Sequence, residues 1–270
     1  MTKIGIIAGD GNLPLYIGKS LLNKKYDVTF LSLNNKNNKL YDNYNVIGID
    51  ILSIKRIFKV LYSNNIKNVI FAGSIKRPGI KDLGFDIETF LLAKNLLLER
   101  KGDNNLLISL KKYFENKGFI FFNWTKYCKE LFSIEINLTR IKPSRKAVLN
   151  LKKAKSIYQI YKKLDVGQSM IVQNQLILGL EAIEGTDELL KRCLDYKRKE
   201  DNGVLLKFSK QNQSNLIDIP LIGLDTIKNL KKYNYEGVFL QKNKCLVLDK
   251  KKIINYANEN KLFISSVELN

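Results

Sequence analysis

The sequence contains no histidine, and this absence removes a large part of enzyme chemistry. Histidine is the commonest general base and the commonest transition-metal ligand in proteins. Ser-His-Asp and Cys-His mechanisms are therefore excluded. Any catalysis by this chain must use carboxylates, lysines, hydroxyls, backbone amides or a hard metal ion held by oxygen atoms.

Cysteine and long apolar runs are also scarce. Cys128, Cys193 and Cys245 are widely spaced and form no C-x-x-C pair, so we expect buried or incidental thiols rather than a zinc site or a disulfide framework. No segment approaches the roughly 20 apolar residues of a membrane span. The apolar run in "MTKIGIIAGDG" is too short for a signal peptide, and we expect a cytoplasmic protein.

Acidic residues are outnumbered, with 26 against 46 basic residues and a formal net charge of +20. One interpretation is nucleic-acid binding. The other is compositional drift, with lysine filling exposed positions. Runs such as "KKAK" and "LDKKKII" fall on the polar faces of amphipathic patterns, which favours drift. A basic surface also suits anionic lipid headgroups or a phosphorylated substrate.

The length of 270 residues, 45% of them hydrophobic, is enough for about two domains. Strand-like runs ("KIGIIAG", "DVTFLSL", "NVIFAG", "FIFFNW") alternate with helical patterns in the first half, which predicts a Rossmann-like parallel α/β sheet. We assign this domain to residues 1–135, a linker to 136–146 and a mixed α/β domain to 147–270. The second domain should contain a long helix and a hairpin that turns at Asn174-Gln175.

The stretch "IAGDGNLP" follows the first predicted strand and provides Gly9 and Gly11. Pro14 replaces the third glycine of a dinucleotide fingerprint, and the second strand ends in "LSLNN", without an acid for a ribose. A nicotinamide cofactor is therefore disfavoured, and we expect no flavin either. The turn either binds an anion at a helix N-terminus or is purely structural.

Two further stretches carry cations or a capping acid in the first half. "FAGSIKRPG" follows the next clear strand and should lie at the same sheet edge, with Gly73 allowing close approach and Lys76 and Arg77 facing a phosphate or pyrophosphate. A solvated basic turn is the alternative. In "ERKGDNN", Asp103 either caps a helix or contacts a ligand.

Carboxylates gather in the second half. "LEAIEGTDELLKR" places four acids, Glu181, Glu184, Asp187 and Glu188, around Gly185 and Thr186. This is either ordinary acid placement at a helix start or a Mg²⁺ or phosphate site. In "NLIDIPLIG", Asp218 has apolar neighbours. A buried carboxylate needs a cation, a donor or a metal, so this is either a functional carboxylate or a turn-forming residue before proline.

Taken together, "IAGDGNLP", "FAGSIKRP", "KGDNNLL", "LDVGQSMIV", "LEAIEGTDELLKR" and "DIPLIG" occur in an order and spacing that resembles the LpxI family. The resemblance runs from Lys3 to about Ser266. Members are UDP-2,3-diacylglucosamine pyrophosphatases of lipid A biosynthesis. The resemblance implies two α/β domains with the active site in the cleft between them, and Mg²⁺-dependent hydrolysis, with Mn²⁺ as an alternative metal. The products would be UMP and 2,3-diacylglucosamine 1-phosphate (lipid X).

The resemblance also implies roles for individual residues. Asp218 lies in the family's D-[LIM]-P-x-[IV]-G motif and would be the catalytic residue and a metal ligand, with Glu184 and Asp187 as further ligands. The expected partners are UDP-2,3-diacylglucosamine and, transiently, the inner-membrane surface; no specific nucleic acid is expected, and a homo-oligomer is compatible with the family. The substrate contacts would come from Gly9, Gly11, Asn12, Gly73, Lys76, Arg77, Lys101, Asp103, Gln168, Gly185, Thr186 and Lys207.

This sequence departs from the family pattern at two places. Asp10 puts a negative charge beside a proposed anion site, where the family usually has a small residue. "KFSKQNQSN" keeps Lys207 and Lys210 of the run before Asp218 but lacks its proline.

Three alternatives to this function remain. The first is a basic nucleic-acid-binding or nucleotide-binding protein without hydrolase activity. The second is a nicotinamide oxidoreductase, and the third is a catalytically inactive relative of the LpxI family. The sequence shows no helix-turn-helix, RRM or KH pattern, and its cations are dispersed. Retention of Asp218 and "EGTD" argues against the inactive relative.

Overall fold

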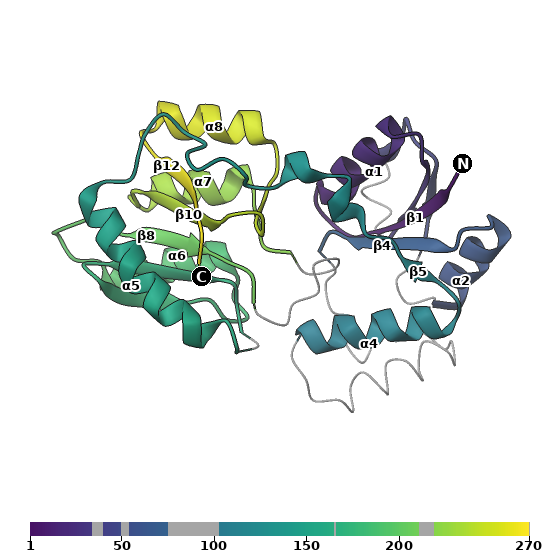
Figure 1. Cartoon of the computed structure of the whole chain (residues 1–270), viewed down its shortest axis with the longest axis horizontal. Coiled ribbons are helices and arrows are strands. Elements are labelled where there is room, and N and C mark those ends of the chain that lie inside the picture. The colour runs from purple at the N-terminus through teal and green to yellow at the C-terminus, as the bar shows by residue number, and fades with distance from the viewer. Residues whose placement is uncertain (34–39, 50–53, 75–102, 165, 211–218, 270) are drawn as a thin grey trace. The chain divides into compact units, whose positions relative to one another are not determined.

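A computed structural model describes residues 1–33, 40–49, 54–74, 103–164, 166–210 and 219–269 (Figure 1). The described residues fall into two compact units, the first within Met1–Lys129 and the second from Glu130 onward. Each unit has its own sheet and its own apolar core. This confirms the predicted fold class of two α/β halves.

The first unit is built on a parallel sheet with the strand order β3-β2-β1-β4-β5. The strands are β1 (Lys3–Ala8), β2 (Asp27–Ser32), β3 (Val46–Gly48), β4 (Asn68–Ala72) and β5 (Ile120–Phe121). The helices are α1 (Leu13–Asn23), α2 (Ile54–Ser63) and α4 (Asp103–Asn116). A short 3₁₀ turn, Trp124–Lys126, follows β5 in place of the longer strand predicted from "FIFFNW".

The strands of this sheet carry apolar side chains on both faces, and helices cover both faces. Ile7 and Leu31 pack with Phe58 of α2 and Phe114 of α4 in one cluster. Successive strand residues point to opposite faces, so Phe30 belongs to the other face. A Cβ at Gly18 of α1 would lie 2.2 Å from the Phe30 ring, which places α1 on that second face. The unit is therefore doubly wound, with helices on both sides of the sheet.

The strand order has a reversal point between β1 and β4. From β1 the chain runs outward through β2 and β3, and it then returns to the other side of β1 to form β4 and β5. In open parallel sheets, the carboxyl ends of the two strands at such a reversal border a crevice in which ligands bind. The loops after β1 and β4 occupy this position.

The second unit has a mixed sheet with the order β12-β10-β8-β6-β7. Strand β6 runs antiparallel to both of its neighbours, and the other pairs are parallel. Its strands are β6 (Ser169–Gln173), β7 (Leu176–Leu180), β8 (Val204–Lys207), β10 (Gly237–Gln241) and β12 (Phe263–Val267). A separate parallel pair joins β9 (Leu221–Ile222) to β11 (Leu246–Val247).

Helices cover both faces of the second sheet (Figure 1). Helix α5 (Arg145–Tyr161) packs on one face through Ala154 and Tyr158, next to Met170 and Phe239. The opposite face packs against α6 (Thr186–Arg192), α7 (Leu224–Lys232) and α8 (Lys250–Glu259). Short 3₁₀ turns lie at Lys129–Leu131 and Cys193–Tyr196.

The predicted hairpin and the expectation for the cysteines are confirmed. Asn174 and Gln175 connect β6 to β7 with φ of 50° and 60°, the conformation that a two-residue hairpin turn requires. Cys128, Cys193 and Cys245 are buried free thiols. None of the described helices is both long and apolar enough to cross a membrane.

Residues 136–146, assigned above to a linker, carry several hydrogen bonds to the second unit. The Leu138 amide donates to the Ile264 carbonyl at 3.0 Å, and the Ser266 amide donates to the Ile136 carbonyl at 2.7 Å. The Ser144 hydroxyl caps α5 by accepting from the Ala147 amide at 3.1 Å. The domain bounds proposed from the sequence stay predictions.

Candidate functional site

In the first unit, the structure brings the two glycine loops together at the reversal point of the sheet. The Gly9 amide donates to the Ala72 carbonyl at 2.9 Å. Asp10 and Ser74 are joined by two backbone hydrogen bonds, of 2.7 Å and 2.9 Å. The prediction that both loops lie at one sheet edge is confirmed.

Gly73 is required by this contact. Its φ is +88°, and a Cβ there would lie 2.7 Å from the Asp10 carbonyl oxygen and 2.8 Å from the Gly9 carbonyl carbon. Gly11 has a similar φ of +90°, but a Cβ at Gly11 would meet no atom within 4 Å. Gly73 therefore allows one loop to lie against the other, whereas Gly11 keeps its side of the loop open.

The helix that follows, α1, begins at this loop. Asn12 is its N-cap residue and makes no side-chain capping bond, Pro14 lies in the first turn, and the first turn contains no acid. Backbone amides at such an end favour an anion.

The Asp10 carboxylate lies close enough to the buried Tyr41 to affect its ionisation. Burial raises the pKa of the Tyr41 phenol, and the charge of Asp10 raises it further. Tyr41 is fully buried, and its hydroxyl makes no hydrogen bond within the structure. The negative charge that departs from the family pattern therefore lies near a neutral tyrosine.

In the second unit, a polar cluster forms where β8 ends. Because β6 is antiparallel to β8, its first residue, Ser169, pairs with Lys207, the last residue of β8. Strand β7 ends at Leu180, so Glu181 follows at the same edge. Thr186 begins α6 after the N-cap residue Gly185, whose φ is +81°.

Lys207 is the centre of this cluster, and its side chain is only 7% exposed. Its ammonium donates to the Ser169 hydroxyl at 3.2 Å and to the Thr186 hydroxyl. The Thr186 hydroxyl in turn donates to Glu181 Oε1 at 3.1 Å. These two bonds use two of the three N–H groups of the ammonium. The result is a buried cation fixed by two hydroxyls, with a carboxylate one hydroxyl further away.

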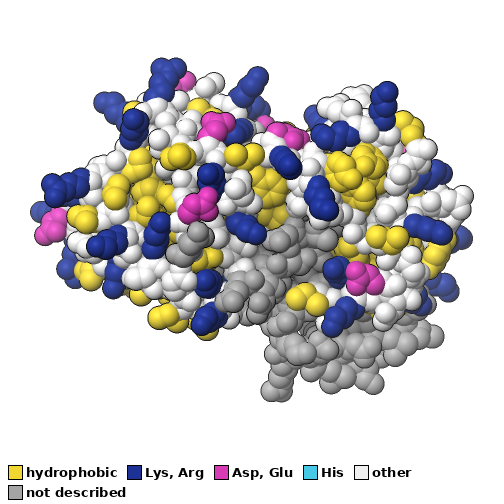
Figure 2. All heavy atoms as spheres, in the orientation of Figure 1, with side chains coloured by type: hydrophobic (Ala, Val, Ile, Leu, Met, Phe, Trp, Pro, Cys, Tyr) yellow, Lys and Arg dark blue, Asp and Glu magenta, His cyan; other side chains and the backbone are white. Residues whose placement is uncertain are grey.

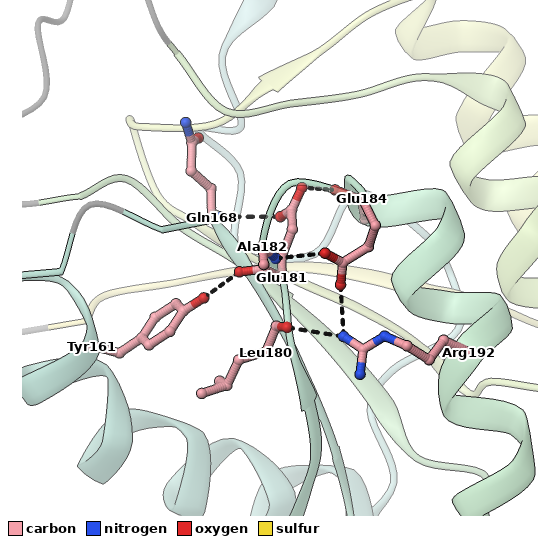
Figure 3. Close-up of polar contacts among 8 residues, drawn as sticks. Tyr161, Gln168, Leu180, Glu181, Ala182, Glu184 and Arg192 are labelled. Atoms are coloured by element: carbon pink, nitrogen blue, oxygen red, sulfur yellow. Dashed lines mark hydrogen bonds and ion pairs between the residues drawn. The ribbon is translucent and has the colours of Figure 1, made fainter. Parts of the chain in front are cut away.

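Glu181 is held from three sides (Figure 3). Its Oε2 accepts from the Gln168 amide at 3.0 Å, and its carbonyl accepts from the Tyr161 hydroxyl at 2.6 Å and the Gly167 amide at 2.9 Å. Burial first, and then the charges of Glu181 and Glu184, raise the pKa of Tyr161, so this phenol stays protonated and acts as a donor. Gln168 thus positions Glu181 through its backbone.

Glu184 faces Arg192 across the start of α6 (Figure 3). Its Oε1 accepts from the guanidinium at 2.6 Å, and its Oε2 accepts from the Ala182 amide at 3.1 Å. Burial by itself would raise the pKa of Glu184, but the hydrogen bonds from Arg192 and the backbone amides outweigh it and lower that pKa. Asp187 is exposed in the first turn of α6.

The described donors do not form a metal site on their own. Within the described ranges, no three Asp, Glu, Cys or His side chains gather in a way that would hold a metal ion. Both oxygens of Glu184 and both oxygens of Glu181 already accept hydrogen bonds. A metal at Glu184 would share the carboxylate with Arg192 and the Ala182 amide.

Several predicted site residues lie outside the described residues: Lys76, Arg77, Lys101 and Asp218. The backbone of Asp103 begins α4, but its side chain is not among those described. Of the remaining predicted residues, Gln168, Gly185, Thr186 and Lys207 come together in the second unit, with Glu184 and Asp187 beside them. Gly9, Gly11, Asn12 and Gly73 come together in the first.

Four residues of the second cluster were not predicted from the sequence to be ligands or substrate contacts: Tyr161, Ser169, Glu181 and Arg192. Glu181 was visible as one of a group of acids, but nothing in the sequence separates it from Glu188. Ser169 had a possible signal, because it begins a strand directly after "LDVGQ" and a small polar residue there is unusual among apolar neighbours. Tyr161 and Arg192 gave no signal beyond helical periodicity.

The structure is thus that of a two-unit α/β protein, with two glycine loops that meet at the edge of the sheet in one unit and a lysine, hydroxyl and carboxylate cluster in the other. The chain belongs to the LpxI family: the family model of the LpxI N-terminal domain matches residues 3–131, and that of the LpxI C-terminal domain matches residues 135–265. A curated relative from Caulobacter vibrioides, named UDP-2,3-diacylglucosamine pyrophosphatase LpxI, is 28% identical over 275 residues, covering 99% of this chain and 98% of the relative. The resemblance stated from the motifs is confirmed.

Proposed function

We propose that this chain hydrolyses the pyrophosphate bond of UDP-2,3-diacylglucosamine to give UMP and 2,3-diacylglucosamine 1-phosphate, in lipid A biosynthesis. Family membership and the name of a relative that matches 99% of the chain support this reaction. The observation in the structure that carries it is the buried Lys207 ammonium, fixed by Ser169 and Thr186 at the carboxyl edge of the second sheet.

When water attacks one phosphorus of a pyrophosphate, the bond from that phosphorus to the bridging oxygen breaks, and negative charge accumulates on this oxygen as it leaves with the other phosphate. A lysine that is already held in place stabilises this charge without reorganising. Among the described residues, two of the three N–H groups of Lys207 have partners, and these two hydroxyls orient the ammonium. Lys76, Arg77 and Lys101 would add positive charge from the first unit, and the Gly9–Gly11 loop and Gly73 would contact part of the nucleotide through backbone amides.

Water must be activated without histidine, because the chain has none. A carboxylate is the available base, and Asp218 in "DIPLIG" is the residue that we assign to it. We also propose that turnover requires Mg²⁺, or Mn²⁺ in its place. A bound Mg²⁺ would offset charge on the pyrophosphate. We assign Asp218, Asp187 and Glu184 to it; Asp187 is exposed in the first turn of α6, and Glu184 would bind it while paired with Arg192.

The substrate carries two acyl chains, so the enzyme would meet it at a membrane surface. We therefore propose a protein of the cytoplasm that contacts the inner membrane transiently. The net charge of +20 supports contact with anionic headgroups.

The experiment measures UMP release from UDP-2,3-diacylglucosamine in mixed micelles, with Mg²⁺ and with EDTA. Wild type is compared with Asp218→Asn, Lys207→Gln and the control Asp225→Asn, an aspartate that is 90% exposed on α7. We expect metal-dependent release that falls by at least about 100-fold in the first two variants, the usual cost of removing one group that acts in the transition state. The control should keep its activity.

Three results would count against parts of the proposal. Absence of UMP from wild type with both metals would remove the reaction. Full activity of Asp218→Asn would remove the assigned base, and full activity in EDTA would remove the metal.

The two glycine loops at the start of α1 favour one other function, that of a nucleotide-binding protein without hydrolase activity. Titration calorimetry with UDP and UMP separates the two. Binding without any turnover of the lipid-linked substrate would favour this alternative.

A further inference from the structure

Residues 136–164 carry a strong positive charge. This stretch has nine cationic residues and no acidic one, between Glu135 and Asp165. Residues 51–81 also lack an acid but have fewer cations, seven. The cations are Arg140, Lys142, Arg145, Lys146, Lys152, Lys153, Lys155, Lys162 and Lys163.

Most of this stretch forms α5, and the helix sorts its residues by face. Ala147, Ala154, Tyr158 and Tyr161 are buried against the sheet. The side facing away follows helical spacing at three and four residues, and we call it the α5 stripe. It consists of Arg145, Val148, Leu149, Lys152, Ser156, Ile160 and, just beyond the helix, Lys163, all of them exposed.

Apolar side chains lie in the α5 stripe among the cations. Ile160 is 68% exposed, Val148 51% and Leu149 39%. In a space-filling view, apolar and cationic side chains intermix over the face of the second unit that α5 covers (Figure 2). Exposed apolar side chains and cations supply the two contributions that bind a helix to an anionic lipid interface, which are buried apolar area and attraction to the headgroups.

The C-terminal end of the α5 stripe leads to the candidate site. The hydroxyl of Tyr161, the last residue of α5, donates to the carbonyl of Glu181 at 2.6 Å. Leu164 and Val166, which follow, are 51% and 37% exposed, and the adjacent Gly167 amide also donates to that carbonyl. Exposed apolar side chains therefore continue from the helix to the edge of the sheet where Lys207 lies.

We propose that the α5 stripe is a docking surface for an anionic lipid bilayer, and that it holds the edge bearing Lys207 at the level of the headgroups. The proposal rests on the proposed function in taking the substrate to be a lipid. Charge complementarity selects the occupant, because the stripe presents three cations and no acid, within a stretch of nine cations, and so matches an anionic surface. The exposed Ile160, Val148 and Leu149 favour a bilayer over RNA. Single-stranded RNA is bound mainly through aromatic and arginine side chains, and the stripe has no aromatic residue and one arginine.

The first test measures co-sedimentation with vesicles of phosphatidylethanolamine and phosphatidylglycerol, and with vesicles of phosphatidylcholine alone. The variant Arg145→Gln/Lys152→Gln/Lys163→Gln removes three charges from the stripe. The matched control Lys231→Gln/Lys251→Gln/Lys252→Gln removes three exposed charges from α7 and α8, on the opposite side of the sheet. Because each cation near such a surface contributes about fivefold to partition, the stripe variant should bind anionic vesicles about 100-fold more weakly than wild type. The control should stay within about threefold, since distant charges are screened.

The second test reports insertion directly. All three native cysteines are buried, so a cysteine introduced at Ile160 can be labelled selectively with an environment-sensitive fluorophore. Its emission should shift to the blue with anionic vesicles, whereas the same label at Lys251→Cys should not respond. Equal responses at both positions, or equal vesicle affinity of the stripe and control variants, would overturn the proposal. A third result would also overturn the proposal: wild type shows no preference for anionic vesicles, and the stripe variant loses binding to single-stranded RNA.

The two proposals fail separately. UMP release in mixed micelles should be unchanged in the stripe variant, because none of its residues contacts the candidate site. If wild type releases no UMP but the stripe variant still loses vesicle binding, the reaction is wrong and the docking surface stands.

Discussion

Three glycines with nearly identical backbone conformation allow a quantitative test of the contact between the two glycine loops. Gly11, Gly73 and Gly118 have φ of +90°, +88° and +87°. Replacing any of them by alanine places a Cβ in a left-handed conformation, which costs about 1–2 kcal/mol. The three sites differ in what the new Cβ meets. Gly73→Ala places it 2.7 Å from the Asp10 carbonyl oxygen, whereas the other two meet nothing within 4 Å.

The crowding at Gly73 adds to the conformational cost, because the opposing atoms are backbone and cannot rotate away. Overpacking of this kind costs about 1–3 kcal/mol. We therefore expect Gly73→Ala to lower the free energy of unfolding of the first unit by about 2–5 kcal/mol, and Gly11→Ala and Gly118→Ala by about 1–2 kcal/mol each.

Urea unfolding of the three variants measures these differences, and UMP release separates structure from function. Gly118 follows α4 and lies outside both glycine loops, so Gly118→Ala should keep its activity. Gly11→Ala and Gly73→Ala should both lose activity, since one places a methyl group in the open part of the loop and the other separates the two loops. If Gly73→Ala is no less stable than Gly118→Ala, the close approach of the two loops is not what requires glycine there.

Three further predictions concern the second unit. Thr186→Val should lower UMP release about 10–100-fold, because the hydroxyl links Lys207 to Glu181. Thr186→Ser should keep most of the activity. Equal loss in both variants would mean that the shape of the threonine side chain matters rather than its hydroxyl. Glu184→Gln should cost at most about 1 kcal/mol of unfolding free energy at neutral pH, since Glu184 and Arg192 are partly exposed. The folded-state pKa of Glu184 is lowered, so its contribution is present above its ordinary pKa and is lost as pH falls through the lowered value. The difference between Glu184→Gln and wild type in urea should therefore shrink as the pH falls below the ordinary pKa of a glutamate carboxyl. Burial raises the pKa of Cys245 to about 12, so native protein should react with a thiol reagent at neutral pH only as slowly as it unfolds, and a fast-reacting thiol would contradict the packing.

The sequence predicted the first sheet and the position of its two glycine loops at one edge, because both follow from local patterns. An apolar run that ends in glycine identifies β1 and β4, and parallel strands place their ends at one edge. Strand β3 was missed because three residues, Val46–Gly48, are too few for periodicity to show. The hairpin at Asn174-Gln175 was also predicted from a local pattern, two apolar runs separated by two polar residues.

The second cluster was predicted only in part, because its geometry depends on strand order. Lys207 meets Ser169 because β6 lies antiparallel beside β8, although 38 residues separate the two in sequence. No local pattern specifies which strands become neighbours. The resemblance to a family supplied Lys207 and Thr186 as candidates, but not Ser169 as their partner, nor the pairing of Glu184 with Arg192.

The hydrogen bonds of residues 130–141 have a consequence for synthesis on the ribosome. Phe132 bridges to Leu246, and Asn137 bridges to Ser265 in β12, so the first residues of the second unit find their partners more than 100 positions later. The Thr139 hydroxyl likewise accepts from the Ile264 amide. The first unit can fold while translation continues, but the second cannot close until β12 has left the exit tunnel. A nascent chain stalled before Phe263 would carry one folded unit and one whose opening segment still lacks its partners.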